Sequence, residues 1–252
     1  MDLACTEQIE TTVIAEKDPF LFRDPRVIKN LLNQESMYVP KCNYFVEVQH
    51  DIQPFMRKVV ATWMHEVCEE QMCEDQILPL AVNCMDRFLC VCPIKKQQLQ
   101  LLGATCLLIA SKMRSTNSLP VDLLCAYTDY SVTYEHVVSW ELLVLSKLDW
   151  NVSAITGFDY VDHIIERFPW GSDSELLRRH AHTLVSISYT EKGTARGPEN
   201  QVPSERKSER KRAREDDYLG GAMCILRSLI AIQKKSPDRP KVYDALCKRV
   251  CV

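Results

Sequence analysis

From Met56 to Leu148 apolar residues recur at helical spacing in one segment after another, and this pattern constrains the fold more than any other feature. In the first segment they lie on one face of a helix, at Met56, Val59, Val60, Trp63, Met64 and Val67. Four further segments show similar apolar patterning, at 75–90, 95–113, 121–129 and 134–148. Pro, Asn and Asp residues separate several of them, as in helix-to-helix turns. The sequence therefore predicts an all-α unit of five helices.

Helix-start signals place another helix before this unit. Asp24 followed by Pro25 is typical of an N-cap and a first helical position, so a helix is expected over 25–36. Residues 1–20 show no sustained periodicity and are predicted to form a flexible arm. We therefore expect the first lobe, with its preceding helix, to occupy 21–150.

A second, degenerate helical lobe is predicted over 151–252. It begins with a linker at 151–157 and helical patterns at 157–168 and 174–189. Residues 191–217 are almost devoid of apolar side chains and are expected to form a polar and basic insert. Apolar periodicity then returns at 218–233 and 241–250, so this lobe is either interrupted by an insert or incomplete.

Composition argues against several functional classes. The chain has 31 basic and 34 acidic residues, a net charge of -3, which indicates neither a nucleic-acid nor a membrane partner. Its 12 cysteines lie mostly in apolar helical stretches, and no secretory leader is evident, so free thiols in a reducing compartment are expected. No apolar run is long enough to span a bilayer.

Catalytic and metal-binding patterns are also missing. The seven glycines form no phosphate-binding loop, and the cysteine spacings form no zinc pattern. His180 and His182 lie two residues apart on a predicted helix and point in different directions. We expect no catalytic site, no metal and no cofactor.

Two charged residues stand among apolar neighbours. Glu141 interrupts VVSWELLVL, and Lys112 ends a helix that is apolar for several turns. A charge in such surroundings needs a partner, because an unpaired buried charge costs several kcal/mol. Two hypotheses follow: an internal salt bridge, or contact with a protein partner. Spacing alone favours the internal one.

The segments FMRKVVATWMHEVCEEQ, PLAVNCMDRFLCV, LQLLGATCLLIASKM and WELLVLSKLDWN strongly resemble the cyclin box of D-type cyclins. The resemblance extends from about residue 25 to about residue 190. It implies an all-α fold of two cyclin-box lobes, each a five-helix repeat, preceded by an N-terminal helix. The short C-terminus, which lacks the family's Pro/Thr-rich tail, resembles that of virus-encoded D-type cyclins of the gammaherpesvirus type.

The resemblance implies a non-catalytic subunit that binds and activates a cyclin-dependent serine/threonine kinase as a heterodimer. The family's five marker residues appear here as Arg57, Asp86, Leu101, Lys112 and Glu141. Arg57 and Asp86 would form an internal salt bridge. The kinase would contact Lys112, Met113, Glu141 and Leu145, which favours the second hypothesis for the two charges.

The resemblance also implies a groove for Arg-x-Leu motifs of substrates and inhibitors. Its residues would be Met56, Val60, Trp63, Glu66 and Gln100. The motif's leucine would fill the groove and its arginine would pair with Glu66. The family's usual Ile-Leu is Val59-Val60 here, so weaker docking is expected. The alternative is that this whole stripe faces the core.

Two short motifs lie near the ends of the chain. Leu3, Cys5 and Glu7 match the Leu-x-Cys-x-Glu pattern by which D-type cyclins bind retinoblastoma-family proteins; the alternative is an arm without function. Lys211, Arg212 and Arg214 have the form of a nuclear import signal, and a solvated loop is an equal alternative. We expect the protein in the nucleus and cytoplasm, of a host cell if it is viral.

Two competing functions are compatible with the same sequence features. A cyclin-fold transcription adaptor would need a basic face for nucleic acid. A decoy would bind kinase inhibitors or retinoblastoma protein without activating a kinase. The favoured hypothesis is a cyclin that promotes cell-cycle entry.

Overall fold

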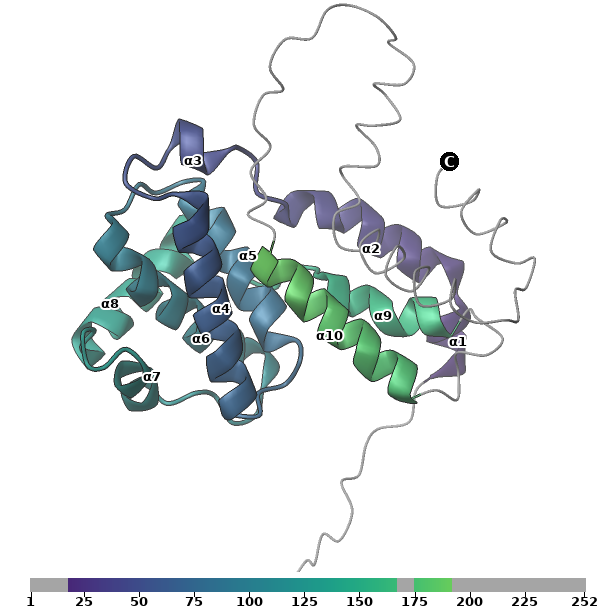
Figure 1. The fold of residues 1–252 in the computed structure, drawn as a ribbon. Helices are drawn as coiled ribbons and strands as arrows, with labels where there is room; N and C mark the ends of the chain where they lie inside the picture. The colour runs from purple at the N-terminus through teal and green to yellow at the C-terminus, as the bar shows by residue number, and fades with distance from the viewer. Residues whose placement is uncertain (1–17, 167–174, 192–252) are drawn as a thin grey trace, which may run out of the picture.

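The computed structural model describes residues 18–166 and 175–191, and every regular element in these ranges is a helix (Figure 1). The helices are α1 (Pro19–Arg23), α2 (Pro25–Tyr38), α3 (Tyr44–Glu47), α4 (Pro54–Glu70), α5 (Ile77–Leu89), the short 3-10 helix η1 (Lys96–Gln98), α6 (Leu99–Arg114), α7 (Val121–Tyr127), α8 (Tyr134–Lys147), α9 (Gly157–Ile165) and α10 (Glu175–Glu191). The predicted all-α class is confirmed. Each helix predicted within these ranges is present, with ends that lie within four residues of the predicted ones.

The helix starts follow the sequence signals. The Asp24 carboxylate accepts a hydrogen bond from the backbone N–H of Arg26 at 2.8 Å and so caps α2. Asp18 and Pro19 repeat this arrangement and start α1, so the predicted arm does not extend through residue 20 as a helix-free segment. Helix α3 was also not predicted, because a single turn carries no periodic pattern.

Helices α5 and α6 form the centre of the first core. Every residue of α5 except Arg87 is buried, and α6 is buried from Leu101 through Ser111. The long apolar run at 99–113 is therefore a core helix. Helix α6 packs against α4, α5 and α8. Helices from the early and the late part of the first lobe therefore meet at α6.

A close approach of α4 and α6 occurs at Gly103. A Cβ atom added there would lie 2.8 Å from Cγ1 of Val60 and 3.3 Å from Sδ of Met64. The absence of a side chain at this position therefore lets the two helices come together.

A second, smaller core lies between α9 and α10, and Figure 1 shows α2 beside them. Its buried residues are Tyr160, Val161, Ile164, Ile165, Leu177, Ala181 and Val185. Leu31 and Leu32 of α2 pack against this core, and Tyr189 packs against both cores. Helix α10 therefore joins the two lobes, and it contacts α4 and α5 as well as α9. The patterns predicted at 218–233 and 241–250 lie outside the described residues.

Candidate functional site

Lys112 and Glu141 form an ion pair at the surface of the first lobe. Lys112 lies in the last turn of α6 and Glu141 lies in α8, and these helices pack side by side. The Lys112 Nζ lies 2.6 Å from Oε1 and 2.9 Å from Oε2 of Glu141. The Lys112 side chain is 47% exposed and that of Glu141 is 18% exposed. The free chain therefore has the internal pair, and the Lys112 ammonium still faces solvent.

Apolar side chains surround this ion pair without being covered. Tyr134, Val138 and Leu142 of α8 are 50%, 42% and 61% exposed, and Met113 of α6 is 47% exposed. With 3.6 residues per turn, positions 134, 138, 141, 142 and 145 fall within about 100° around the helix. We call this set the α8 surface; it comprises Lys112, Met113, Tyr134, Val138, Glu141, Leu142 and Leu145. Sequence reasoning missed Tyr134, Val138 and Leu142, although their four-residue spacing was a usable signal.

A second, partly exposed region runs along α4. We call it the α4 surface; it comprises Met56, Val60, Trp63, Glu66 and Gln100. Met56, Val60, Trp63 and Gln100 are half-buried, and Glu66 is exposed. The alternative that the whole apolar stripe of α4 faces the core is wrong. Met64 and Val67 are buried and Met56, Val60 and Trp63 are half-buried against the core, but Val59 is exposed.

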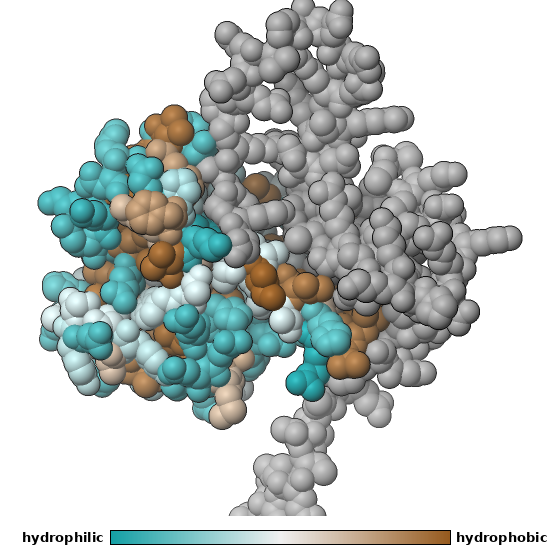
Figure 2. All heavy atoms as spheres, in the orientation of Figure 1, coloured by the Kyte–Doolittle hydropathy of each residue, from teal (hydrophilic) through white to brown (hydrophobic). Residues whose placement is uncertain are grey.

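Phe55 and Val59, both 63% exposed, lie next to Met56 and Val60 and widen the exposed apolar area of α4. In the view of Figure 2, hydrophobic side chains reach the surface of this lobe in small patches among hydrophilic ones. The Trp63 indole is held in place, because its Nε1–H donates to the carbonyl of Tyr127 at 3.3 Å.

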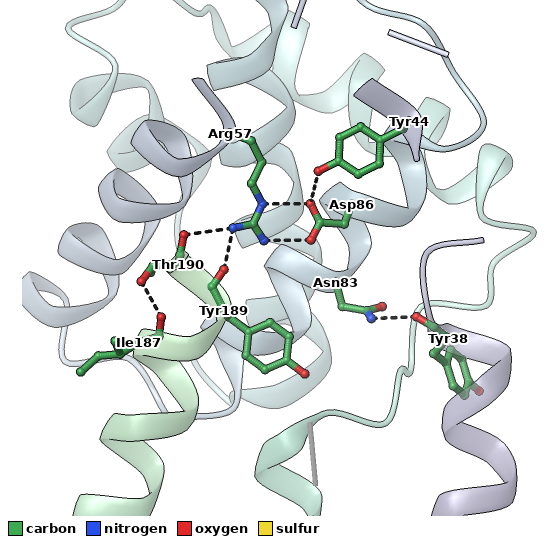
Figure 3. A network of polar contacts seen from close by, with 8 residues as sticks. All are labelled: Tyr38, Tyr44, Arg57, Asn83, Asp86, Ile187, Tyr189 and Thr190. Carbon is green, nitrogen blue, oxygen red and sulfur yellow. Dashed lines mark hydrogen bonds and ion pairs between the residues drawn. The ribbon is translucent and has the colours of Figure 1, made fainter. Parts of the chain in front are cut away.

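Arg57 lies at the centre of a buried polar network (Figure 3). Its Nε and Nη2 atoms donate to the two carboxylate oxygens of Asp86 at 3.1 and 2.8 Å, which joins α4 to α5. Its Nη1 donates to the backbone carbonyls of Tyr189 and Thr190 at 2.7 and 3.1 Å. One guanidinium therefore connects the first lobe to the C-terminal end of α10, a contact that the sequence did not indicate.

The electrostatics keep this network charged. Burial lowers the pKa of Arg57, but the Asp86 carboxylate and Tyr44 together outweigh this effect, so the net pKa lies above its usual value. Tyr44 donates from its hydroxyl to Asp86 at 2.9 Å, and burial together with that carboxylate raises the pKa of Tyr44. The tyrosine therefore remains a protonated donor. The arrangement positions helices and offers no exposed reactive group.

Other site classes receive no support in the described ranges. Within residues 18–166 and 175–191, no three His, Cys, Asp or Glu side chains are grouped so as to hold a metal ion. None of the described helices combines the length and hydropathy needed to cross a membrane. The proposed retinoblastoma motif at residues 3–7 and the basic cluster at 211–214 lie outside the described residues.

Comparison with known proteins gives consistent matches. The family described as "Cyclin, N-terminal domain" matches residues 26–153. G1/S-specific cyclin-D2 of Xenopus laevis is 47% identical over 203 residues, which cover 80% of this chain and 69% of the relative. G1/S-specific cyclin-D3 of Homo sapiens is 43% identical and covers 80% of this chain and 70% of the relative. The crystal structure of a viral cyclin from herpesvirus saimiri has a TM-score of 0.61 and 26% identity, covering 67% of this chain and 73% of that one.

The helical lobe built around α6 and the match over 26–153 define the class of this protein: the chain belongs to the cyclin family. Within that family it is homologous to the D-type, G1/S-specific cyclins, and it shares its fold with a viral cyclin. The chain is accordingly a regulatory subunit of a cyclin-dependent kinase.

Proposed function

We propose that the α8 surface binds the kinase next to its mobile αC helix and thereby activates it. The observation that carries this proposal is the exposed ion pair of Lys112 and Glu141 among uncovered apolar side chains. Such a combination offers both an apolar contact area and a charge that fixes orientation. Kinase activity depends on the position of αC, so a subunit that binds the active arrangement better switches the enzyme on. To move the ratio of active to inactive kinase from about 1:99 to 99:1, the subunit must bind the active state more tightly than the inactive state by roughly 5.5 kcal/mol.

The internal ion pair is compatible with docking. A lysine ammonium has three donors, and two of them are directed at the Glu141 carboxylate oxygens. The third donor and the remaining lone pairs of Glu141 are available to backbone groups of a partner. The pair thus orients both side chains before the kinase arrives, which lowers the ordering cost of association.

A charge exchange distinguishes docking from a purely internal role. In the double variant Lys112→Glu with Glu141→Lys, the two side chains still form an ion pair, but its polarity is reversed toward the partner. We expect this variant to keep its helical circular-dichroism spectrum and unfolding midpoint and to lose activation of the purified kinase. Lys29→Glu, on the exposed face of α2, serves as a charge-reversed control that activates normally. Full activation by the exchanged variant contradicts kinase docking through this pair.

The α4 surface is proposed to bind Arg-x-Leu motifs of substrates and inhibitors, so that the kinase is directed to such substrates. The half-buried Val60 and Trp63 supply an apolar floor, and the exposed Glu66 supplies a carboxylate for the arginine. The pair Val59-Val60 is two methylenes smaller than the family's usual Ile-Leu. Full burial of both against a ligand is worth about 1.6 kcal/mol, or roughly 15-fold in affinity.

Peptide binding and kinase assays test this second surface separately from the first. Trp63→Ala is expected to weaken binding of an Arg-x-Leu peptide and phosphorylation of substrates with that motif. Phosphorylation of a substrate without the motif is expected to be unchanged, because Trp63 lies in α4 and is not part of the α8 surface. An equal loss for both substrates would point to damage of the fold instead.

The remaining elements of the proposal rest on sequence motifs alone. Leu3, Cys5 and Glu7 are proposed to bind retinoblastoma-family proteins, and Lys211, Arg212 and Arg214 to direct import into the nucleus. The partner is proposed to be a serine/threonine kinase, and this chain to have no catalysis of its own. Replacing Cys5 and Glu7 is expected to abolish retention of the retinoblastoma protein in a pull-down while kinase binding persists.

A further inference from the structure

Two cysteines that lie 48 residues apart in sequence meet between the N-terminal region and α5. Cys42 is in the segment that connects α2 to α3, and Cys90 is the C-cap residue of α5. The Sγ of Cys42 lies 3.8 Å from the carbonyl oxygen of Cys90, and the Sγ of Cys90 lies 3.9 Å from the carbonyl oxygen of Cys42. Both thiols are free and half-buried. This reciprocal contact places each sulfur beside the backbone of the other residue.

We propose that Cys42 and Cys90 are a site of reversible disulfide formation, in which hydrogen peroxide is the oxidant. A disulfide requires that the two residues approach closely with their side chains directed at one another. The reciprocal sulfur–carbonyl contacts place the two residues side by side, and the Cys42 thiol also interacts with the Cys90 thiol.

The backbone around both cysteines is already fixed in place. The side-chain amide of Gln49 donates to the carbonyls of Leu89 and Cys92 at 2.7 and 2.8 Å, and its oxygen accepts from the N–H of Ile94 at 3.0 Å. On the other side of Cys42, the Asn83 amide donates to the carbonyl of Tyr38 at 2.8 Å (Figure 3). Residues 38–49 are therefore bound to α5 and to the loop that follows it, independently of the thiols. The sulfurs can join with little movement of the chain.

The order of the reaction follows from the environment of the two thiols. Burial, reinforced by the neighbouring Cys42 thiol, raises the pKa of Cys90 to about 12, so Cys90 is protonated at neutral pH. Because the thiolate is the attacking form, Cys90 is a poor nucleophile toward peroxide, and the proposed sequence starts at Cys42. Its sulfur attacks one peroxide oxygen, the O–O bond breaks, and hydroxide leaves and takes up a proton to become water, giving a sulfenic acid.

The sulfur of Cys90 then displaces the hydroxyl group from the sulfenic acid, which leaves as the second water with the Cys90 proton. In total two S–H bonds break and one S–S bond forms. Hydrogen peroxide is reduced to two waters.

The crosslink would close a loop that contains α3, α4 and α5. Constraining a loop of this length in the unfolded chain is expected to raise the unfolding midpoint on the order of 10 °C. Cys68 and Cys73, by contrast, are five residues apart at the end of α4, where the N–H of Cys73 donates to the carbonyl of Cys68 at 2.9 Å. A bond between those two would constrain little, so they provide an internal comparison.

The test uses the full chain in a Cys68→Ser, Cys73→Ser background, which removes the second close pair. After treatment with hydrogen peroxide and blocking of residual thiols, tryptic digestion is expected to yield peptide 42–57 linked to peptide 88–95. Non-reducing mass measurement should give a monomer. The link should persist in Cys92→Ser, disappear in Cys90→Ser, and be reversed by dithiothreitol. The oxidised protein should unfold at a higher temperature than the reduced one.

Four outcomes overturn the proposal. These are a link from Cys42 to Cys92 in place of Cys90, a link between two chains, sulfinic acid on Cys42 without a crosslink, or an oxidised form with an unchanged midpoint. Since Cys92 lies two residues from Cys90 and is also half-buried, Cys92→Ser is the matched control for local thiol loss.

Discussion

Replacing Arg57 by methionine tests how the two lobes are held together. Methionine has a similar length, so the change removes the charge and the donors with little change of volume. Arg57 is 1% exposed and donates two hydrogen bonds to Asp86 and two to the carbonyls at the end of α10. In the variant, the buried Asp86 carboxylate loses the guanidinium and keeps the hydrogen bond from the Tyr44 hydroxyl. The carbonyls of Tyr189 and Thr190 lose the guanidinium as a donor.

The magnitude follows from two opposing terms. Hydrogen bonds to a charged group are worth about 1.5–3 kcal/mol each, but burying the guanidinium costs several kcal/mol in lost hydration. The net cost of removing one partner of such a buried pair is about 3–5 kcal/mol. For a chain of this size, that loss lowers the unfolding midpoint by roughly 6–20 °C. Because two of the four bonds go to α10, tryptic cleavage at Arg178 and Arg179 should also become faster.

Thermal and urea unfolding monitored by circular dichroism provide the measurement. Lys29→Met removes an exposed positive charge from α2 and should change stability by less than about 0.5 kcal/mol. Adding Asp86→Asn to Arg57→Met should recover part of the loss, since no unpaired carboxylate then remains buried. A loss below about 1 kcal/mol for Arg57→Met, or the same loss in the Lys29 control, would refute this account of the network.

Three further predictions concern α6, α9 and α10. In Gly103→Ala, the new Cβ would lie 2.8 Å from Val60 and should displace that side chain. We expect a loss of about 1–2 kcal/mol in urea unfolding and weaker binding of an Arg-x-Leu peptide. Unchanged peptide affinity would contradict the close approach of the two helices. Burial lowers the pKa of His182 despite the nearby carboxylates of Asp75 and Asp162, so unfolding takes up a proton below the unfolded pKa of about 6.5. Stability should therefore fall as pH drops below about 6.5, and it should fall less steeply in His182→Gln when midpoints are compared across pH. Thr156→Ala should cost about 1 kcal/mol in chemical denaturation, because Thr156 forms the capping box of α9; a neutral result would show that the cap is dispensable.

Local sequence signals accounted for most of the helices. Apolar spacing from Met56 onward, and proline or aspartate at helix starts, determined where α2, α4 and the later helices begin. These signals depend only on residues within a turn or two of the chain, so they can be recognised from the sequence without the fold. The repeated Asp-Pro signal at Asp18 and Pro19 was present but overlooked. Helix α3 carried no such signal, because its Tyr44 is held by burial and by a hydrogen bond to Asp86, 42 residues away.

Which polar groups meet was decided only by tertiary packing. The sequence marked Lys112 and Glu141 as charges in need of partners, yet either an internal pair or a protein partner satisfied that need. Their contact, and that of Arg57 with the end of α10, depend on how α6, α8 and α10 pack. Helical periodicity determines which face of a helix is apolar, whereas the neighbour of a given side chain depends on the angles and distances between helices. Those quantities arise from side-chain packing across the whole lobe, which no local pattern encodes.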